Sequence, residues 1–152
     1  MERKTLFVRV VSQEGEVFNG EAQAVFCRSF GGDVGIYPNH SQLLSLIRPG
    51  AVRIKPREGE EILLYISGGI LEVQPSMLLI LADVIERPEE LNQAAAEEAM
   101  AEARALLSKV SQKGELPEEE SALKYYEAQQ NLEEATAKLR VLGLEGCRGG
   151  DQ

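Results

Sequence analysis

The nine residues GDVGIYPNH, at positions 32–40, hold the chain's only histidine, His40, after a turn stiffened by Pro38. A histidine could serve as a general acid or base, or as one ligand of a metal ion. Either role needs companions: a serine or cysteine nucleophile in a recognisable elbow, or further ligands at HExxH or CxxC spacing. No such pattern occurs in the sequence. We therefore predict no catalytic residue and no metal site, and interpret His40 as a turn or surface residue.

Two glycine-rich segments, FGGDVG and SGGIL, could bind phosphate through their backbone. Neither is GxxxxGK[ST] or GxGxxG followed by a helix, and Asp33 would repel an anion. Both are more typical of tight turns, in which glycine permits a positive φ. Cys27 and Cys147 lie far apart and form neither a disulfide framework nor a zinc pattern. We predict no cofactor, and the GDVGIYPNH loop is left as a surface for recognition by a partner.

Composition limits the partners further. The chain has 152 residues and a formal net charge of -9, which repels nucleic acid and anionic lipid. It contains no run of 18 uncharged apolar residues, so we expect neither nucleic-acid binding nor direct membrane insertion. The start, MERKTLFVRV, has the character of neither a signal peptide nor a transit peptide, and we interpret it as a mature cytoplasmic start.

Residues 1–86 are built from short β-type runs separated by turn residues. Several runs alternate with period two, and no helical spacer of ten residues or more divides them. This pattern favours an antiparallel sandwich or barrel over βαβ units. The runs are TLFVRVV, AQAVFCRSF, AVRIKP, EILLYIS, ILEV and MLLILAD.

Residues 87–142 change to Ala, Glu, Gln and Leu and predict an antiparallel two-helix hairpin. Pro88 and Pro117 are typical of helix starts, and Gly143 of a helix end, which leaves 143–152 as a disordered tail. Many seam positions are alanine, which favours helix but buries little apolar area. The hairpin is therefore either a movable element or a permanent appendage. The predicted seams are Leu91, Ala95, Ala99, Ala103, Leu106 and Val110, and Tyr125, Ala128, Leu132, Ala135, Leu139 and Leu142.

The runs GDVGIYPNHSQLLSLIRPGAVRI and LLYISGGILEVQPSMLLILAD, closed by AKLRVL, resemble the epsilon subunit of bacterial and chloroplast-type rotary ATP synthases. The resemblance covers roughly residues 4–142 in the same order. It implies an α+β fold, a ten-stranded antiparallel β-sandwich followed by a two-helix hairpin. It also implies a non-catalytic central-stalk subunit of a proton- or sodium-driven enzyme, located peripherally on the cytoplasmic face of the bacterial inner membrane or on the thylakoid stromal face.

The resemblance further implies three partners: the gamma subunit, the c ring and the alpha/beta catalytic hexamer. The residues matched to the c-ring contact are Asp33, Gly35, Ile36, Tyr37 and His40, with Ile36 and Tyr37 expected to anchor the loop inward. The residues matched to the gamma contact are Ser67, Gly68, Gly69, Leu71 and Glu72.

In the family the hairpin folds against the sandwich or extends along gamma, where helix bases meet an acidic stretch of beta and restrain hydrolysis. Here those bases are Lys124, Lys138 and Arg140. Residues 87–152 carry 14 acids and 8 bases, so we expect only local pairs. ATP-binding members have Ile/Leu-Asp-x-x-Arg-Ala, whereas residues 91–96 read LNQAAA and lack the acid and the arginine. We therefore expect weak or absent ATP binding by this motif.

Two alternatives remain. The chain could be a β-sandwich adaptor whose hairpin binds another helical partner, which co-purification would separate from a rotor subunit. It could also be a small enzyme that uses His40, in which case His40→Ala would abolish turnover.

Overall fold

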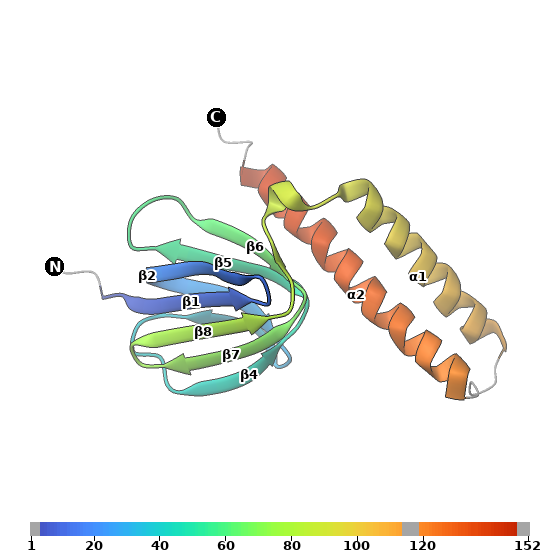
Figure 1. The fold of residues 1–152 in the computed structure, drawn as a ribbon, viewed down its shortest axis with the longest axis horizontal. Coiled ribbons are helices and arrows are strands. Elements are labelled where there is room, and N and C mark those ends of the chain that lie inside the picture. Colours follow the sequence, from blue (N-terminus) through green and yellow to red (C-terminus); the bar gives the residue numbers. More distant parts are fainter. Residues whose placement is uncertain (1–3, 114–118, 149–152) are drawn as a thin grey trace.

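The computed structural model describes residues 4–113 and 119–148, and it divides into a β-sandwich and a two-helix hairpin (Figure 1). The fold class predicted from the sequence is confirmed. The strands are β1 (Leu6–Ser12), β2 (Gly15–Ser29), β3 (Gly32–Ile36), β4 (Leu43–Ile47), β5 (Gly50–Pro56), β6 (Ile62–Ile66), β7 (Gly69–Gln74), β8 (Met77–Ala82) and β9 (Ile85–Glu86).

The described residues form nine strands, and the long strand β2 belongs to both layers. The first half of β2 pairs with β1 in the layer β1-β8-β7-β4, and its second half pairs with β3 and β5 in the layer that continues through β6 to β9. The register shifts between Ala22 and Ala24, where the strand passes from one layer to the other. Counted once per layer, β2 brings the nine strands to the predicted ten. Pairing is antiparallel except between β1 and β8.

Period-two alternation determines which side chains enter the core between the layers. Leu6, Val8 and Val10 are buried on β1, whereas Phe7 and Arg9 face outward. On β5, Val52 and Ile54 are buried and their neighbours are not, as the sequence predicts. The other strands complete the core with Val25, Ile36, Leu64, Ile66, Leu71, Val73, Leu78 and Ile80.

The hairpin consists of α1 (Gln93–Lys113) and α2 (Glu119–Arg148), preceded by a single 3-10 turn at Pro88–Glu90. The predicted start of the first helix at Pro88 is therefore wrong. Leu91 is extended, with φ -76° and ψ 136°, which ends the 3-10 turn. The side chain of Asn92 then begins α1 by accepting a hydrogen bond of 3.0 Å from the backbone N–H of Ala95. The predicted restart at Pro117 lies outside the described residues.

The end of α2 also differs from the prediction. Gly143 does not cap the helix, which continues to Arg148, so most of the segment 143–152 predicted as a disordered tail is helical. A glycine inside a helix costs about 1 kcal/mol relative to alanine, which a long helix can absorb. Residues 149–152 lie outside the described part of the chain.

The seam between the helices is made of alanine, as predicted. The described residues most deeply buried there are Ala96 and Ala103 on α1 and Ala128 and Ala135 on α2, whereas Ala95 and Leu106 of the predicted stripe are exposed. Each buried methyl group contributes only about 0.8 kcal/mol. Helix α2 lies between α1 and the sandwich (Figure 1), so one helix holds the hairpin in place.

Candidate functional site

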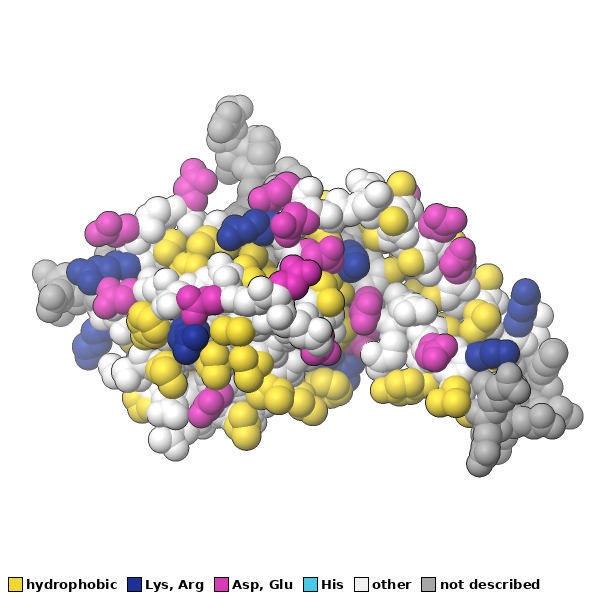
Figure 2. All heavy atoms as spheres, viewed as in Figure 1, with side chains coloured by type: hydrophobic (Ala, Val, Ile, Leu, Met, Phe, Trp, Pro, Cys, Tyr) yellow, Lys and Arg dark blue, Asp and Glu magenta, His cyan; other side chains and the backbone are white. Residues whose placement is uncertain are grey.

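An exposed apolar row crosses the outer face of the layer β4-β7-β8. Leu46 on β4 pairs in register with Ile70 on β7, and Ile70 pairs with Leu81 on β8. Their exposed fractions are 58%, 44% and 43%. Hydrophobic side chains gather over these strands on the face that Figure 2 presents. Exposed apolar side chains that lie next to one another on a sheet are typical of interaction surfaces.

A groove of about 480 Å³ lies beside this row. Ser67, Gly68 and Gly69 line it, together with Ile70 and Leu81 of the row and Glu133 of α2. The structure thus brings the start of the predicted gamma-contact segment next to the exposed apolar side chains. A partner seated here would meet β7, β8 and the hairpin at once.

The remaining two predicted gamma-contact residues are placed differently. Leu71 is fully buried in the core, and Glu72 lies half-buried on the outward side of β7. The surface residues that the sequence reasoning missed are Leu46, Ile70 and Leu81. The alternation in GILEV contained this signal, since only one of Ile70 and Leu71 can face the core.

The fold itself requires glycine at positions 68 and 69, independently of any partner. Gly68 has φ +105°, which favours glycine. A Cβ on Gly69 would lie 2.0 Å from the carbonyl oxygen of Leu81, so only glycine allows β7 and β8 to approach this closely. Ser67 holds the turn between β6 and β7 through two hydrogen bonds to Val84. Its N–H donates to Val84 O at 3.0 Å, and its Oγ accepts from Val84 N–H at 3.1 Å.

The residues predicted to face the c ring are spread along β3 and the loop that follows it. Asp33 is exposed near α2, and Ile36, in the core with an exposed fraction of 0%, anchors the strand. Gly35 lies under the ring of Phe26, to which a Cβ would come within 3.1 Å. Tyr37 is 56% exposed and meets Phe26 edge to face at 5.9 Å, so the expectation that it anchors inward is wrong.

The turn after β3 is held by its own backbone. His40 N–H donates to Tyr37 O at 3.1 Å, and Asn39, with φ +65°, donates its N–H to Pro75 O at 2.9 Å. The Nδ1–H of His40 donates to Ser41 O at 2.7 Å, so this ring serves the shape of the loop. Among the described residues, no group of three or more His, Cys, Asp or Glu side chains is arranged to hold a metal ion.

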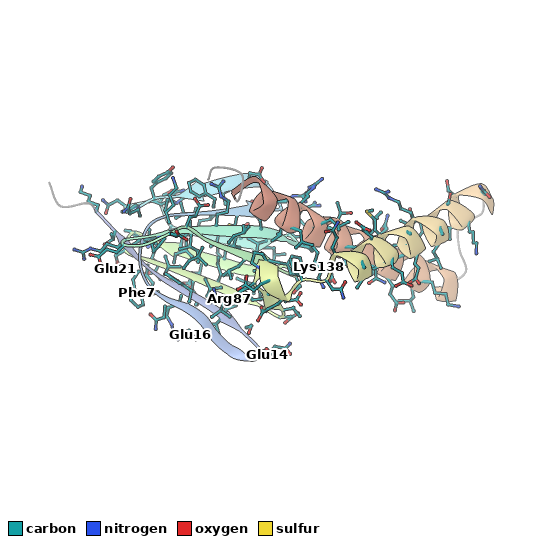
Figure 3. All side chains as sticks on the ribbon, turned by 90° about the horizontal axis from the view of Figure 1, so that it is seen from above. Phe7, Glu14, Glu16, Glu21, Arg87 and Lys138 are labelled. Atoms are coloured by element: carbon teal, nitrogen blue, oxygen red, sulfur yellow. The ribbon has the colours of Figure 1, made fainter. Side chains whose placement is uncertain are left out.

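The three predicted regulatory bases have different environments. Lys138 pairs with Glu86 of β9 at 3.4 Å and lies over the ring of Tyr65 at 5.2 Å, at the junction of sandwich and hairpin (Figure 3). Arg140 is exposed beside the sandwich, and Lys124 lies on the far part of α2, facing the groove between the helices. Lys138 is thus engaged in holding the hairpin down.

The junction itself is a small apolar contact around Tyr65. Tyr65 and Leu63 of β6 are buried against Ala137 and Val141 of α2. Burial, with the carboxylates of Glu134, Glu86 and Glu133 nearby, raises the pKa of the Tyr65 phenol well above its ordinary value. Removal of α2 would expose this phenol.

The described residues offer little reactive chemistry. Burial raises the pKa of Cys27 to about 12, with a further contribution from Asp33, so its thiol stays protonated and is a poor nucleophile. Neither described helix is long and apolar enough to cross a membrane. The distinctive surfaces are the apolar row, the β3 loop and the hairpin junction.

Comparison with known proteins gives a consistent result. The ATP synthase epsilon chain of Thioalkalivibrio sulfidiphilus is 41% identical over 139 residues, which cover 91% of this chain and 92% of that protein. The epsilon chain of Neisseria meningitidis is 45% identical over 117 residues, which cover 76% and 84%. Both relatives share most of their length with this chain.

Two solved structures share the fold at low identity. A chain of the Euglena gracilis mitochondrial ATP synthase matches with a TM-score of 0.71 at 20% identity, over 89% of this chain and 81% of that one. A chain of the Tetrahymena thermophila mitochondrial ATP synthase central stalk and c ring matches with a TM-score of 0.60 at 12% identity, over 93% and 99%. The family model of the beta-sandwich domain of the ATP synthase delta/epsilon chain matches residues 5–88. The chain therefore belongs to the ATP synthase delta/epsilon chain family, as an accessory and non-catalytic subunit.

Proposed function

We propose that this subunit rotates with the central stalk, coupling the catalytic alpha/beta hexamer through gamma to the c ring, and that its hairpin restrains ATP hydrolysis. The exposed row of Leu46, Ile70 and Leu81 carries the proposal. A stalk subunit needs a permanent contact with the shaft, and an apolar strip on a rigid sheet provides one. The neighbouring groove, lined by Ser67 and Gly68, extends that contact.

The β3 loop supports the c-ring half of the proposal. Asp33 is an exposed carboxylate, His40 is half-buried, and Tyr37 adds an exposed ring. Ile36 in the core and the backbone bonds of the turn make the loop rigid. A stiff loop with a carboxylate fits polar and basic loops of a ring that the subunit must drive. Through this assembly the subunit is membrane-associated, and we place it on the cytoplasmic face of the bacterial membrane or its stromal equivalent.

The proposed contact with gamma predicts that a charge in the apolar row weakens gamma binding. Leu46→Asp should weaken co-purification with gamma on the order of 30-fold or more, because a charge placed in the centre of an apolar contact must lose its water. Glu60→Lys is the control, since Glu60 is exposed in the turn between β5 and β6, in the other layer, and should leave binding unchanged. If Leu46→Asp binds gamma as the native chain does, the adaptor alternative gains and the shaft contact lies elsewhere.

The brake half of the proposal rests on how weakly the hairpin is held. Alanine fills the helix seam, and the junction with the sandwich adds the Lys138–Glu86 pair and a 3.5 Å pair between Arg48 and Glu133. Part-exposed ion pairs contribute at most about 1 kcal/mol each. The difference between docked and extended hairpins is therefore within the range that a partner can shift.

We also propose that the first-helix segment does not bind ATP. Asn92, in the place of the acid of the binding motif, is used to cap α1, and Ala95 stands in the place of the arginine. The groove between the helices is lined by Glu86, Glu90, Glu102, Glu127 and Glu134 against Lys124 and Lys138. Such a groove repels a triphosphate.

Calorimetric titration of the isolated chain with ATP should accordingly show no tight binding. The comparison is the double variant Asn92→Asp/Ala95→Arg, which restores both side chains of the motif and should raise the affinity. Tight binding to the native chain would show that other residues replace the motif.

A further inference from the structure

One groove, of about 440 Å³, lies where the sandwich meets the hairpin and is lined by Arg28 and Arg53 of the sandwich and by Arg140 of the hairpin. Arg28 comes from the outer face of β2, and Arg140 comes from α2. The ring of Phe26, over which the Arg53 guanidinium lies at 5.4 Å, gives the groove an apolar lining together with Ala51 and Ala137. The groove can therefore hold a ligand that touches both parts of the molecule.

Within the described residues, Arg28 and Arg140 lack the ion pairs that other arginines of the chain make. In the sandwich, Arg9, Arg48, Arg53 and Arg57 each pair with a glutamate at 2.6 to 3.5 Å. Within the described part of the chain, neither Arg28 nor Arg140 has a carboxylate oxygen within 4.0 Å. In a chain with a net charge of -9, two unpaired guanidinium groups in one groove are a local concentration of positive charge.

The residues around Arg28 and Arg140 leave room for an anion. Gly35 and Gly50 keep the lining at backbone level beside Phe26. The side chain of Arg28 passes across Gly50, whose Cβ position would lie 3.7 Å from Arg28 Cβ and 3.9 Å from its Cδ. Among the described lining residues Asp33 is the one acid, opposite Arg28 in the pairing of β2 with β3. It opposes binding and offsets one of the charges.

We propose that this groove binds a phosphate-class oxyanion that bridges Arg28 and Arg140 and thereby holds the hairpin on the sandwich. Each guanidinium presents parallel N–H groups that match two phosphate oxygens. Since only the docked hairpin supplies both arginines, the anion binds that state and increases its population. The effect on ATP hydrolysis rests on the proposed brake function, whereas the anion site itself does not.

Amide chemical shifts of the isolated full chain, titrated with inorganic phosphate at constant ionic strength, test the site. We expect saturable shifts around Arg28, Ala51 and Arg140. Arg28→Gln and Arg140→Gln should each raise the midpoint at least tenfold, because each removes a charged hydrogen-bond donor. Asp33→Asn should lower the midpoint, and Arg9→Gln, whose arginine pairs with Glu16, should leave it unchanged.

A parallel titration with AMP separates the two sources of a phosphate group. Equal midpoints would support recognition of free phosphate, and a lower AMP midpoint at the same amides would support recognition of the phosphate of a nucleotide. Shifts that do not saturate, or that both glutamine variants retain, would mean that the arginines hold no anion and would overturn the proposal.

Hydrogen exchange tests the bridge. Phosphate should slow exchange of the α2 amides around Ala137 and Val141 at least tenfold in the native chain at saturation, and should not do so in Arg140→Gln. Saturable binding without slower exchange would overturn the bridging role. These samples contain no gamma subunit or hexamer, so a negative result leaves the rotor proposal intact. Conversely, a failure of gamma binding leaves the anion-site proposal intact.

Discussion

Gly69→Ala should destabilise the sandwich by at least about 3 kcal/mol, the upper part of the range for overpacking. The added Cβ would lie 2.0 Å from Leu81 O and 2.9 Å from Ala82 Cα, and both are backbone atoms that no side-chain rotation can move. Strands β7 and β8 must separate at this point, and β8 is the neighbour of β1 in the same layer. Urea or thermal unfolding followed by circular dichroism measures the loss, which corresponds to a fall in Tm of roughly 12 °C or more.

Gly20→Ala is the matched control, because a Cβ there meets only the Phe18 ring at 3.6 Å. It should be neutral or slightly stabilising, since alanine loses less backbone entropy on folding. If Gly69→Ala unfolds at the native midpoint, the approach of β7 to β8 is looser than described. The same variant bears on the proposed gamma contact, because loss of gamma binding in Gly69→Ala would report a distorted sheet and not a lost side-chain contact.

Ala137→Asp should detach the hairpin from the sandwich while both parts keep their fold. Ala137 is 3% exposed and packs with Val141 against Leu63 and Tyr65. Burying a carboxylate without a partner in this contact costs on the order of 3 kcal/mol or more. The junction consists of few apolar side chains, so its stabilisation does not offset this cost. The matched control is Ala105→Asp, an alanine exposed in the middle of α1.

The ionisation of Tyr65 reports detachment directly. In the docked hairpin its raised pKa keeps the phenol protonated where an exposed phenol ionises, around pH 10. The protonated form is favoured by docking, so this contribution to docking is complete below about pH 10 and decreases as pH rises above it. Tyrosinate absorbance should therefore show one more tyrosine ionising around pH 10 in Ala137→Asp than in the native chain. Equal titrations would show that the hairpin stays docked.

The same variant tests the brake in the assembled enzyme. A detached hairpin is free to extend, so Ala137→Asp should lower ATP hydrolysis by the catalytic complex, whereas a chain ending after Glu86 should raise it. If neither change alters hydrolysis, the subunit has a coupling role only. Replacing Lys124, Lys138 and Arg140 together by glutamate separates the roles of charge and shape: unchanged inhibition would exclude an electrostatic latch on beta.

The sequence predicted the layers well, because period-two alternation is a local property. The inward positions of β1 and β5 and the alanine seam of the hairpin followed from spacing alone. The helix ends did not, since Pro88 and Gly143 are typical of ends but do not enforce them. Asn92 and the extended Leu91 decided the start of α1, and the helical backbone continued past the glycine.

The candidate surfaces were harder to predict than the fold. The resemblance indicated the SGGIL segment but included Leu71, which is buried, and omitted Ile70, which is exposed. Leu46, Ile70 and Leu81 come from three strands, and only their register places them in one row. The groove of Arg28 and Arg140 depends on how α2 lies on the sandwich, which no pattern within either segment specifies.

The passage of β2 through both layers has a mechanical consequence. A sandwich whose two sheets met only through side chains could slide under a twisting load, because apolar contacts resist shear weakly. Here 15 residues of one continuous backbone, Gly15–Ser29, belong to both sheets. In the proposed rotor, torque received on the β4-β7-β8 side would pass along this shared strand to the layer that holds β3, and the domain would turn as a single stiff body.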